Sequence, residues 1–146
     1  MYFVDRNKVE DRLTYLEVRL SLLETQTDWK TGIEKAALER VAHSIIEAVI
    51  DTGNDIIDGF IMRDPGSYDD IVDILLDEKV ITEELAASLK EIISLRKMLV
   101  QEYTTIDHQK VDQVFKKNLE LLKQFPIKVR SYLNNELGPV SAFKNL

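Results

Sequence analysis

The sequence has no cysteine, no uninterrupted apolar run long enough to span a membrane, and no stretch that resembles a signal peptide. The first absence excludes disulfides and thiolate metal sites, and the other two favour a cytoplasmic protein with no membrane association. With 146 residues and no obvious linker, the chain is expected to fold as a single domain, residues 1–146, around one core.

Basic residues are in the minority, and the formal net charge is -7. A surface that binds nucleic acid over its whole extent needs clustered lysine and arginine, so any contact with RNA must be local. Residues 1–103 carry 22 acidic and 12 basic side chains, whereas residues 104–146 carry 4 acidic and 7 basic ones. This asymmetry gives the C-terminal part a modest positive field, although basic residues on the outer face of a helix are often simply exposed to solvent with no binding role.

Strand-like alternation, internal repeats and low-complexity tracts are all missing, whereas apolar residues recur at helical spacing. The sequence therefore predicts an all-α, up-and-down bundle of about five helices. A first helix is expected to begin near Asp5, and its inward stripe comprises Val9, Leu13, Leu16, Leu20 and Leu23. A second should start at the capping-box pair Thr31 and Glu34 and extend toward Phe60, weakened at Gly53; its periodic apolar residues are Ile33, Ala37, Val41, Ile45, Ile46 and Val49.

Three further helices are predicted after the turn at residues 63–67. A short one opens at Ser67 with Asp70, and another is capped by Thr82 and includes RKMLVQEY, residues 96–103, in its last turns. The fifth is capped by Asp107, with Pro126 kinking or restarting it and Gly138 and Pro139 ending it. The inward residues of these three helices are Ile71, Ile74, Leu75, Leu85, Leu89, Ile92, Leu99, Val111, Val114, Phe115, Leu122, Phe125, Val129, Tyr132 and Leu133.

The segment RKMLVQEY places several polar and charged side chains at the end of the fourth predicted helix. On a continuous helix Arg96 and Tyr103 would share one stripe, whereas Gln101 would point about 140° away from Arg96. Gln101 converges with Arg96 only if the helix ends or bends here, or if a second subunit contributes its copy across a two-fold axis. Spacing alone favours ordinary surface roles for all three residues.

The chain resembles the HepT-like branch of the HEPN proteins, which are helical ribonuclease toxins paired with minimal nucleotidyltransferase antitoxins. The family motif is an arginine, a polar residue, a histidine four to six residues on, and a tyrosine two beyond it. Arg96 and Tyr103 fill the arginine and tyrosine slots, whereas Gln101 stands in the histidine slot and Lys97 replaces the usual asparagine after the arginine. The resemblance extends to ERVAHSIIEAVIDTGNDIID, with Asp51 and Asn54 in the family's aspartate and asparagine slots, and to SYDDIVDILLDEKVIT.

The resemblance implies a homodimer whose two motif helices border one cleft, where RNA is cleaved through the ribose 2′-hydroxyl without metal or cofactor. Arg96 would clamp the scissile phosphate through paired hydrogen bonds, while Asp51, Asn54 and Lys97 would support the cleft. Gln101 can orient water or phosphate, but a carboxamide does not relay protons near neutral pH. Cleavage should therefore be weak or use another base, and losing proton transfer costs on the order of 10² to 10⁴ in rate.

Three other residues bear on this interpretation. In some family members the antitoxin transfers AMP from ATP to the motif tyrosine, so Tyr103 is the implied modification site. His43 and His108 fall outside the motif spacing; His43 is expected to be a hydrogen-bonded structural histidine, and His108 a polar residue in the first turn of the next helix.

Two alternative functions remain open. The first is a non-catalytic dimer that binds a nucleotide, RNA or a protein, which the loss of the motif histidine favours. The second is metal-dependent nucleotide hydrolysis on an acidic stripe of the second helix, although a solvated face is the commoner role for such a stripe. The residues of that stripe are Asp51, Asn54, Asp55 and Asp58.

Overall fold

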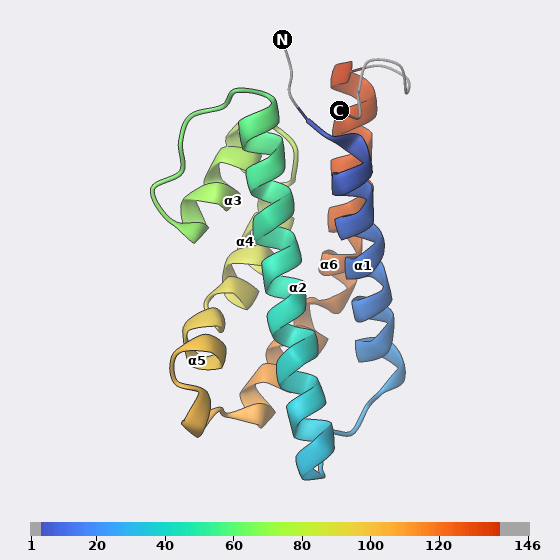
Figure 1. Ribbon diagram of the computed structural model, residues 1–146, viewed down its shortest axis with the longest axis vertical. Coiled ribbons are helices and arrows are strands. Elements are labelled where there is room, and N and C mark those ends of the chain that lie inside the picture. Colours follow the sequence, from blue (N-terminus) through green and yellow to red (C-terminus); the bar gives the residue numbers. More distant parts are fainter. Residues whose placement is uncertain (1–3, 138–146) are drawn as a thin grey trace.

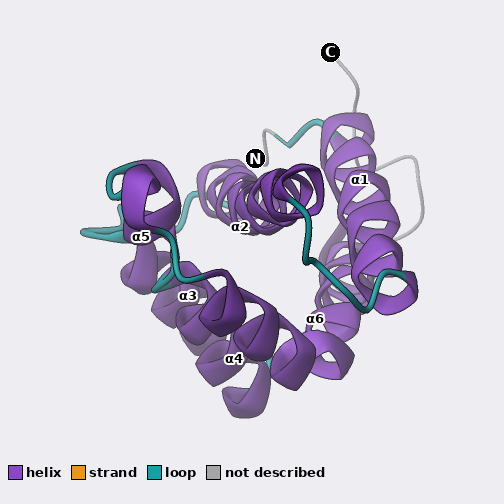
Figure 2. Cartoon of the chain, turned by 90° about the horizontal axis from the view of Figure 1, so that it is seen from below, coloured by secondary structure: helices purple, strands orange, loops and turns teal. Residues whose placement is uncertain are grey.

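The computed structural model describes residues 4–137, and this part of the chain is all-α, as predicted. Its elements are α1 (Arg6–Thr25), α2 (Gly32–Gly59), α3 (Tyr68–Asp77), α4 (Glu83–Ile93), α5 (Arg96–Val100), a 3-10 turn η1 (Tyr103–Thr105) and α6 (His108–Leu137). Figure 1 shows α2 between α1 and α6 on one side and α3 and α4 on the other. Seen end-on in Figure 2, the helices surround one core, and α5 lies beside α2, away from α1.

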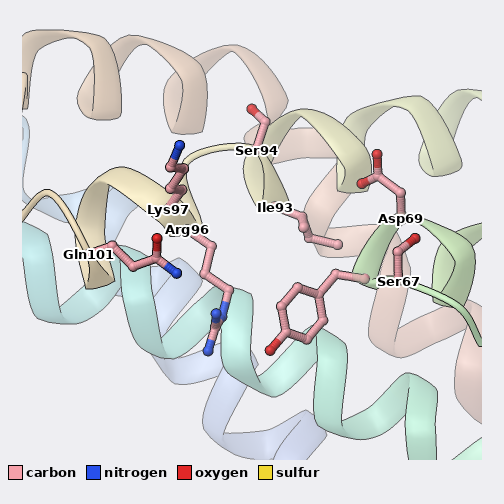
Figure 3. Close-up of a pocket in the computed structure, with 8 residues that line it drawn as sticks. Ser67, Asp69, Ile93, Ser94, Arg96, Lys97 and Gln101 are labelled. Atoms are coloured by element: carbon pink, nitrogen blue, oxygen red, sulfur yellow. The ribbon is translucent and has the colours of Figure 1, made fainter.

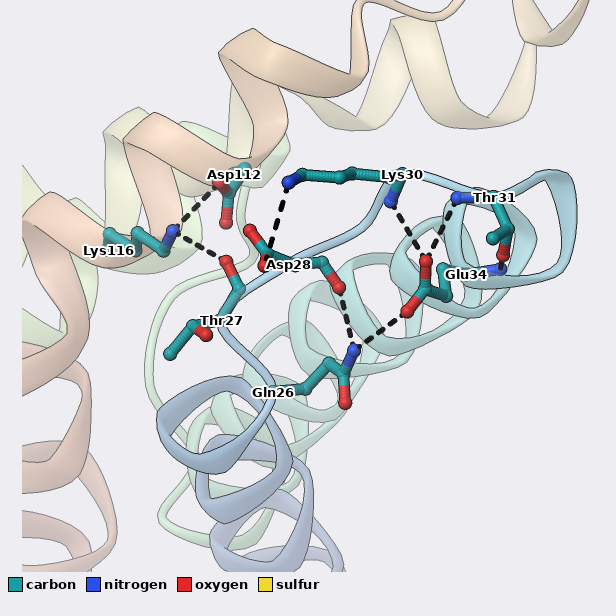
Figure 4. A network of polar contacts seen from close by, with 8 residues as sticks. All are labelled: Gln26, Thr27, Asp28, Lys30, Thr31, Glu34, Asp112 and Lys116. Carbon is teal, nitrogen blue, oxygen red and sulfur yellow. Dashed lines mark hydrogen bonds and ion pairs between the residues drawn. The ribbon is translucent and has the colours of Figure 1, made fainter.

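The predicted caps set the beginnings of the helices. Asp5, Ser67, Thr82 and Asp107 each accept a hydrogen bond from the backbone N–H three residues later. Thr31 and Glu34 form the predicted capping box, in which each side chain accepts from the backbone N–H of the other residue. Figure 4 shows this box within the α1–α2 connection, where Lys116 of α6 donates to the carbonyl oxygen of Thr27 at 3.1 Å.

The predicted apolar stripes form the core, with one correction in the first turns of α2. All five stripe residues of α1 are buried, as are the inward residues predicted for α3. Ile33, however, is 84% exposed and Ala37 is also exposed, so the buried face of α2 begins at Leu38 instead. The first turns of α2 project beyond the neighbouring helices, as Figure 1 shows, and find no core to pack against.

Gly53 has a packing role that its helix propensity did not indicate. The helix continues through it, and a Cβ atom at this position would stand 2.5 Å from Cγ2 of Ile71 in α3. Because glycine lacks a Cβ atom, α3 can approach α2 closely. If a Cβ were present, the side chain of Ile71 would have to shift. The residue that weakens α2 therefore also brings α3 against it.

The fourth predicted helix is interrupted, so the bundle has one short helix more than predicted. The Ser94 hydroxyl donates to the carbonyl oxygen of Glu91 at 2.6 Å, and the N–H of Leu95 bonds three residues back, to Ile92, at 3.1 Å. Such side-chain bonding competes with the helical ladder and tightens the last turn. Residues 96–100 consequently form α5, a separate helix, rather than the end of α4.

The last helix passes through Pro126 without restarting and reaches Leu137. Proline lacks an N–H, so one bond of the helical ladder is missing there, but Pro126 and the neighbouring Phe125 are buried against the core. The predicted termination at Gly138 and Pro139 lies outside the described residues. Among the helices of residues 4–137, none combines the length and the apolar character needed to cross a bilayer.

Candidate functional site

Arg96 is the first residue of α5, and its guanidinium is held from two sides. Its Nε donates to Oε1 of Glu47 in α2 at 2.7 Å, and its Cζ lies 4.6 Å from the ring centre of Tyr68 in α3. These contacts fix the plane of the group through a charge-assisted hydrogen bond and a cation–π interaction. Nη1 and Nη2 form no hydrogen bond within residues 4–137, so two donors in fork geometry remain for an anion.

A cavity of about 390 Å³ adjoins Arg96 at the junction of three helices. The N-terminus of α3, the C-terminus of α4 and α5 supply its walls, as Figure 3 shows. Its lining residues are Ser67, Tyr68, Asp69, Ile93, Ser94, Arg96, Lys97 and Gln101. We call it the Arg96 pocket.

Gln101 lines the Arg96 pocket together with Arg96, so the two residues converge within one chain. The sequence predicted this only if the helix ended or bent, and α5 does end there: Gln101 is its C-cap, and its N–H bonds to the carbonyl oxygen of Lys97 at 2.8 Å. Lys97 also lines the pocket, but its side chain extends away from that of Arg96 in Figure 3. The Lys97 ammonium lies 3.8 Å from Oε2 of Glu102.

Tyr103 does not share a stripe with Arg96, and that prediction was wrong because the helix ends between them. Tyr103 begins the turn η1, and it is absent from the lining of the Arg96 pocket. The residue is 67% exposed. It follows Gln101 by two residues and therefore stays at the edge of the same region.

Asp51 and Asn54 do not line the Arg96 pocket. Asp51 lines a smaller cavity between α1 and α2 that also includes Glu47. Asn54 lines a cavity beside Ser67 and Tyr68, which are shared with the Arg96 pocket. Asn54 is thus connected to the Arg96 pocket through Ser67 and Tyr68, and Asp51 only through Glu47, the hydrogen-bond partner of Arg96.

The acidic stripe of α2 is divided among different partners. Asp55 forms an ion pair with Arg12 of α1, and Asp51 faces a different cavity from Asn54. Within residues 4–137, no three or more carboxylate or imidazole side chains are grouped closely enough to hold a metal ion. Asp55 thus ties α2 to α1, and the stripe assembles no ligand set within these residues.

Two carboxylates of α2 were missed by the sequence reasoning. Glu47 accepts from Arg96 and also contacts His43 Nε2 at 3.1 Å, while Glu39 contacts His108 Nε2 at 2.7 Å. The only signal was the spacing of His43 and Glu47, four residues apart on one helix. The partner of Arg96, 49 residues away along the chain, has no local signature.

The α3 side of the pocket is held by a second arginine. Arg63 donates from Nη1 and Nη2 to the two carboxylate oxygens of Asp70 at 2.7 and 2.8 Å, and the N–H of Gly66 donates to Oδ2 at 2.8 Å. The Arg63 guanidinium, followed by that backbone N–H, lowers the pKa of Asp70 to about 2. This network fixes the turn that leads into Ser67 and Tyr68.

The family model for ribonuclease HepT-like proteins matches residues 11–129, which include α2, the Arg96 pocket and most of α6. The chain belongs to the HepT-like family. Its candidate RNase relative YutE from Bacillus subtilis strain 168 is 55% identical over 144 residues, covering 99% of this chain and 100% of YutE.

Solved structures support the HepT-like assignment at the level of the fold. The structure of YutE, described as a cytosolic protein of unknown function, has a TM-score of 0.95 and covers 98% of this chain and 100% of its own. A tri-AMPylated HEPN toxin from Shewanella oneidensis, in complex with an MNT antitoxin, has a TM-score of 0.74 at 20% identity, covering 84% of this chain and 96% of its own. The HEPN-like fold is thereby confirmed.

Proposed function

We propose that this HepT-like protein is a metal-independent RNA endonuclease in which Arg96 holds the scissile phosphate. The observation that carries the proposal is the geometry of Arg96: Glu47 engages Nε, Tyr68 lies against the guanidinium, and Nη1 and Nη2 remain for phosphate oxygens. A fork of this kind binds phosphate in bidentate fashion. Family membership and the RNase description of YutE point in the same direction.

Gln101 is assigned a positioning role in the proposed reaction. It lines the Arg96 pocket and can hold a water molecule or a phosphate oxygen, but its amide cannot exchange a proton near neutral pH. Cleavage is therefore slow or uses a proton-transfer group elsewhere. Lys97 adds positive charge at the pocket, and Asp51 and Asn54 support it from neighbouring cavities on α2.

We also propose a homodimer in the cytoplasm whose partner is a minimal nucleotidyltransferase. HEPN relatives of the same fold are complexed with MNT antitoxins, and YutE is described as cytosolic. Two copies whose α5 segments face one another would close the Arg96 pocket, which is open on one side in the single chain. Light scattering at micromolar concentration should give twice the chain mass, and an active monomer would contradict the shared cleft.

Tyr103 is the proposed site at which the partner acts. Its phenol oxygen would attack the α-phosphorus of ATP, forming a tyrosyl–AMP bond while pyrophosphate leaves. The added phosphate lies at the border of an arginine site and would compete with RNA for it. Intact-mass measurement after incubation with the partner and ATP should show AMP on the wild type and on Tyr68→Phe, but not on Tyr103→Phe. Modification of Tyr103→Phe would contradict this assignment.

The ribonuclease proposal is tested by comparing wild type, Arg96→Ala and Lys128→Ala on single-stranded RNA with the divalent metals chelated. Lys128 lies on α6 near the Arg130 that pairs with α1, so its substitution removes one positive charge far from the pocket. Only Arg96→Ala should abolish cleavage. Cleavage that requires added magnesium would favour the acidic stripe of α2, and Arg96-dependent binding without cleavage would favour the non-catalytic module.

A further inference from the structure

One stripe of α2 bonds to both ends of the segment that runs from α5 to the start of α6. Glu39, His43 and Glu47 are spaced four residues apart, so they occupy neighbouring positions on one face of the helix. Glu47 holds Arg96 at the beginning of α5, and Glu39 holds His108 at the beginning of α6. His43 therefore lies between these two anchor points along α2, one turn from the carboxylate that holds Arg96.

The hydrogen bond of His43 defines which nitrogen carries its proton. Nε2 lies 3.1 Å from Glu47 Oε1, the same oxygen that accepts from Nε of Arg96. A carboxylate only accepts, so Nε2 must donate, and in the neutral imidazole the proton-accepting nitrogen is then Nδ1. Within the described residues, Nδ1 has no hydrogen-bond partner, and the side chain is 32% exposed. Glu47 thus orients one imidazole and one guanidinium together.

We propose that His43 performs the proton transfer that Gln101 cannot, an inference that rests on the proposed ribonuclease function. Nδ1 takes the proton of a ribose 2′-hydroxyl, and the 2′-oxygen attacks the adjacent phosphorus held by Arg96. A new phosphorus–oxygen bond forms while the bond to the 5′-oxygen breaks. Water protonates the leaving 5′-oxygen, which gives a 2′,3′-cyclic phosphate and a 5′-hydroxyl, and the imidazolium then returns its proton to solvent.

The carboxylate of Glu47 supports both halves of this step. It accepts the hydrogen bond from Nε2 and so fixes the tautomer in which Nδ1 is the proton-accepting nitrogen. Its simultaneous bond to Arg96 keeps the base and the phosphate-binding group in fixed relation. His108 has a comparable carboxylate partner in Glu39, but Glu39 does not bond to Arg96. His108 therefore lacks the coupling to the phosphate-binding group and serves as the matched control for His43.

The test measures metal-free RNA cleavage by His43→Gln, His108→Gln and the double variant His43→Gln with Gln101→His. His43→Gln should lower the rate on the order of 10² to 10⁴, as expected for the loss of a general base. His108→Gln should retain the wild-type rate. Because the double variant restores an imidazole at the motif position, it should recover cleavage relative to His43→Gln, which a purely structural defect would not allow.

Two results would overturn the role of His43: His43→Gln cleaving as fast as wild type, or no gain when Gln101→His is added to it. Complete absence of Arg96-dependent cleavage in the wild type would instead overturn the proposed function, and the inference with it. His43→Asn is measured alongside, with circular dichroism on every variant. Loss of fold in one His43 variant therefore leaves the other to decide.

Discussion

Two walls of the Arg96 pocket, at the start of α3 and at α5, are built in different ways. The wall at the start of α3 is held by contacts within eight residues, namely the Ser67 cap and the bonds from Arg63 and Gly66 to Asp70. The opposite wall, α5, is held to α2 by the bond between Arg96 and Glu47, which are 49 residues apart along the chain. One wall is local in sequence, and the other exists only in the folded bundle.

The α3 wall therefore shapes the pocket, whereas the α5 wall places the side chains that are proposed to act on RNA. The α3 wall presents Ser67, Tyr68 and Asp69 to the pocket. The α5 wall carries Arg96 and Gln101 and is held by Glu47 of α2. Substitution of Glu47 should therefore affect function more than substitutions in the α3 network, whose effects should be on stability.

The largest effect is expected for Glu47→Ala, which removes the anchor of the α5 wall. Arg96 would lose a charge-assisted hydrogen bond in a partly buried place, and we expect the free energy of unfolding to fall by about 2 kcal/mol. RNA cleavage should fall as well, since Arg96 and His43 both lose their common partner. Urea unfolding measures the first effect and a metal-free cleavage assay the second.

Glu102→Ala is the control for that substitution. Glu102 lies 3.8 Å from the exposed Lys97, and an exposed pair contributes about 0–1 kcal/mol. If Glu47→Ala and Glu102→Ala lowered the free energy of unfolding and the cleavage rate equally, the bond between Glu47 and Arg96 would have no special role in holding α5.

A smaller effect is expected for Gly53→Ala, which presses α3 away from α2. The added Cβ would meet Ile71 at 2.5 Å, and overpacking costs about 1–3 kcal/mol, while replacing glycine within a helix returns about 0.5–1 kcal/mol. The net loss should be about 1 kcal/mol by urea unfolding. Gly32→Ala has open space around its Cβ and should cause no loss. A Gly53→Ala protein at least as stable as wild type would show that α3 moves to accommodate the added Cβ without loss of stability.

The smallest effect is expected for Asp70→Asn and depends on pH. Because the pKa of Asp70 is lowered from 3.8 to about 2 in the folded protein, the ionised carboxylate stabilises the fold above pH 3.8, and that contribution disappears as the pH falls toward 2. The melting temperature of Asp70→Asn should be below that of wild type at pH 7, and the two should converge near pH 2. A gap that does not depend on pH would exclude the Arg63 pair as its cause.

The local wall, and most of the fold, could be predicted from the sequence. Caps such as Ser67 and Thr82 have spacings that can be read directly, and the buried stripe of α1 follows from periodicity. The exposed Ile33 shows the limit of periodicity, because it cannot tell where a neighbouring helix stops. The sequence could state the condition for Gln101 to join Arg96, but not that α5 would end at Gln101 and so fulfil it.

The partners of the functional side chains were beyond sequence reasoning for a physical reason. An acidic residue on a long helix has the same local signature whether it is solvated or buried against an arginine from a distant segment. Only the packing of α5 on α2 selects Glu47 among the many carboxylates of this chain. The family resemblance identified Arg96, but it did not identify the groups that hold it.

The most direct test of the Arg96 pocket as an RNA phosphate site is the affinity for a short single-stranded RNA with 2′-deoxy substitutions that prevent cleavage, measured by fluorescence anisotropy. Arg96→Ala should weaken binding by about tenfold or more, since a hydrogen bond between charged groups contributes about 1.5–3 kcal/mol. Lys128→Ala should bind nearly as wild type does. Equal affinities of wild type and Arg96→Ala would contradict the account.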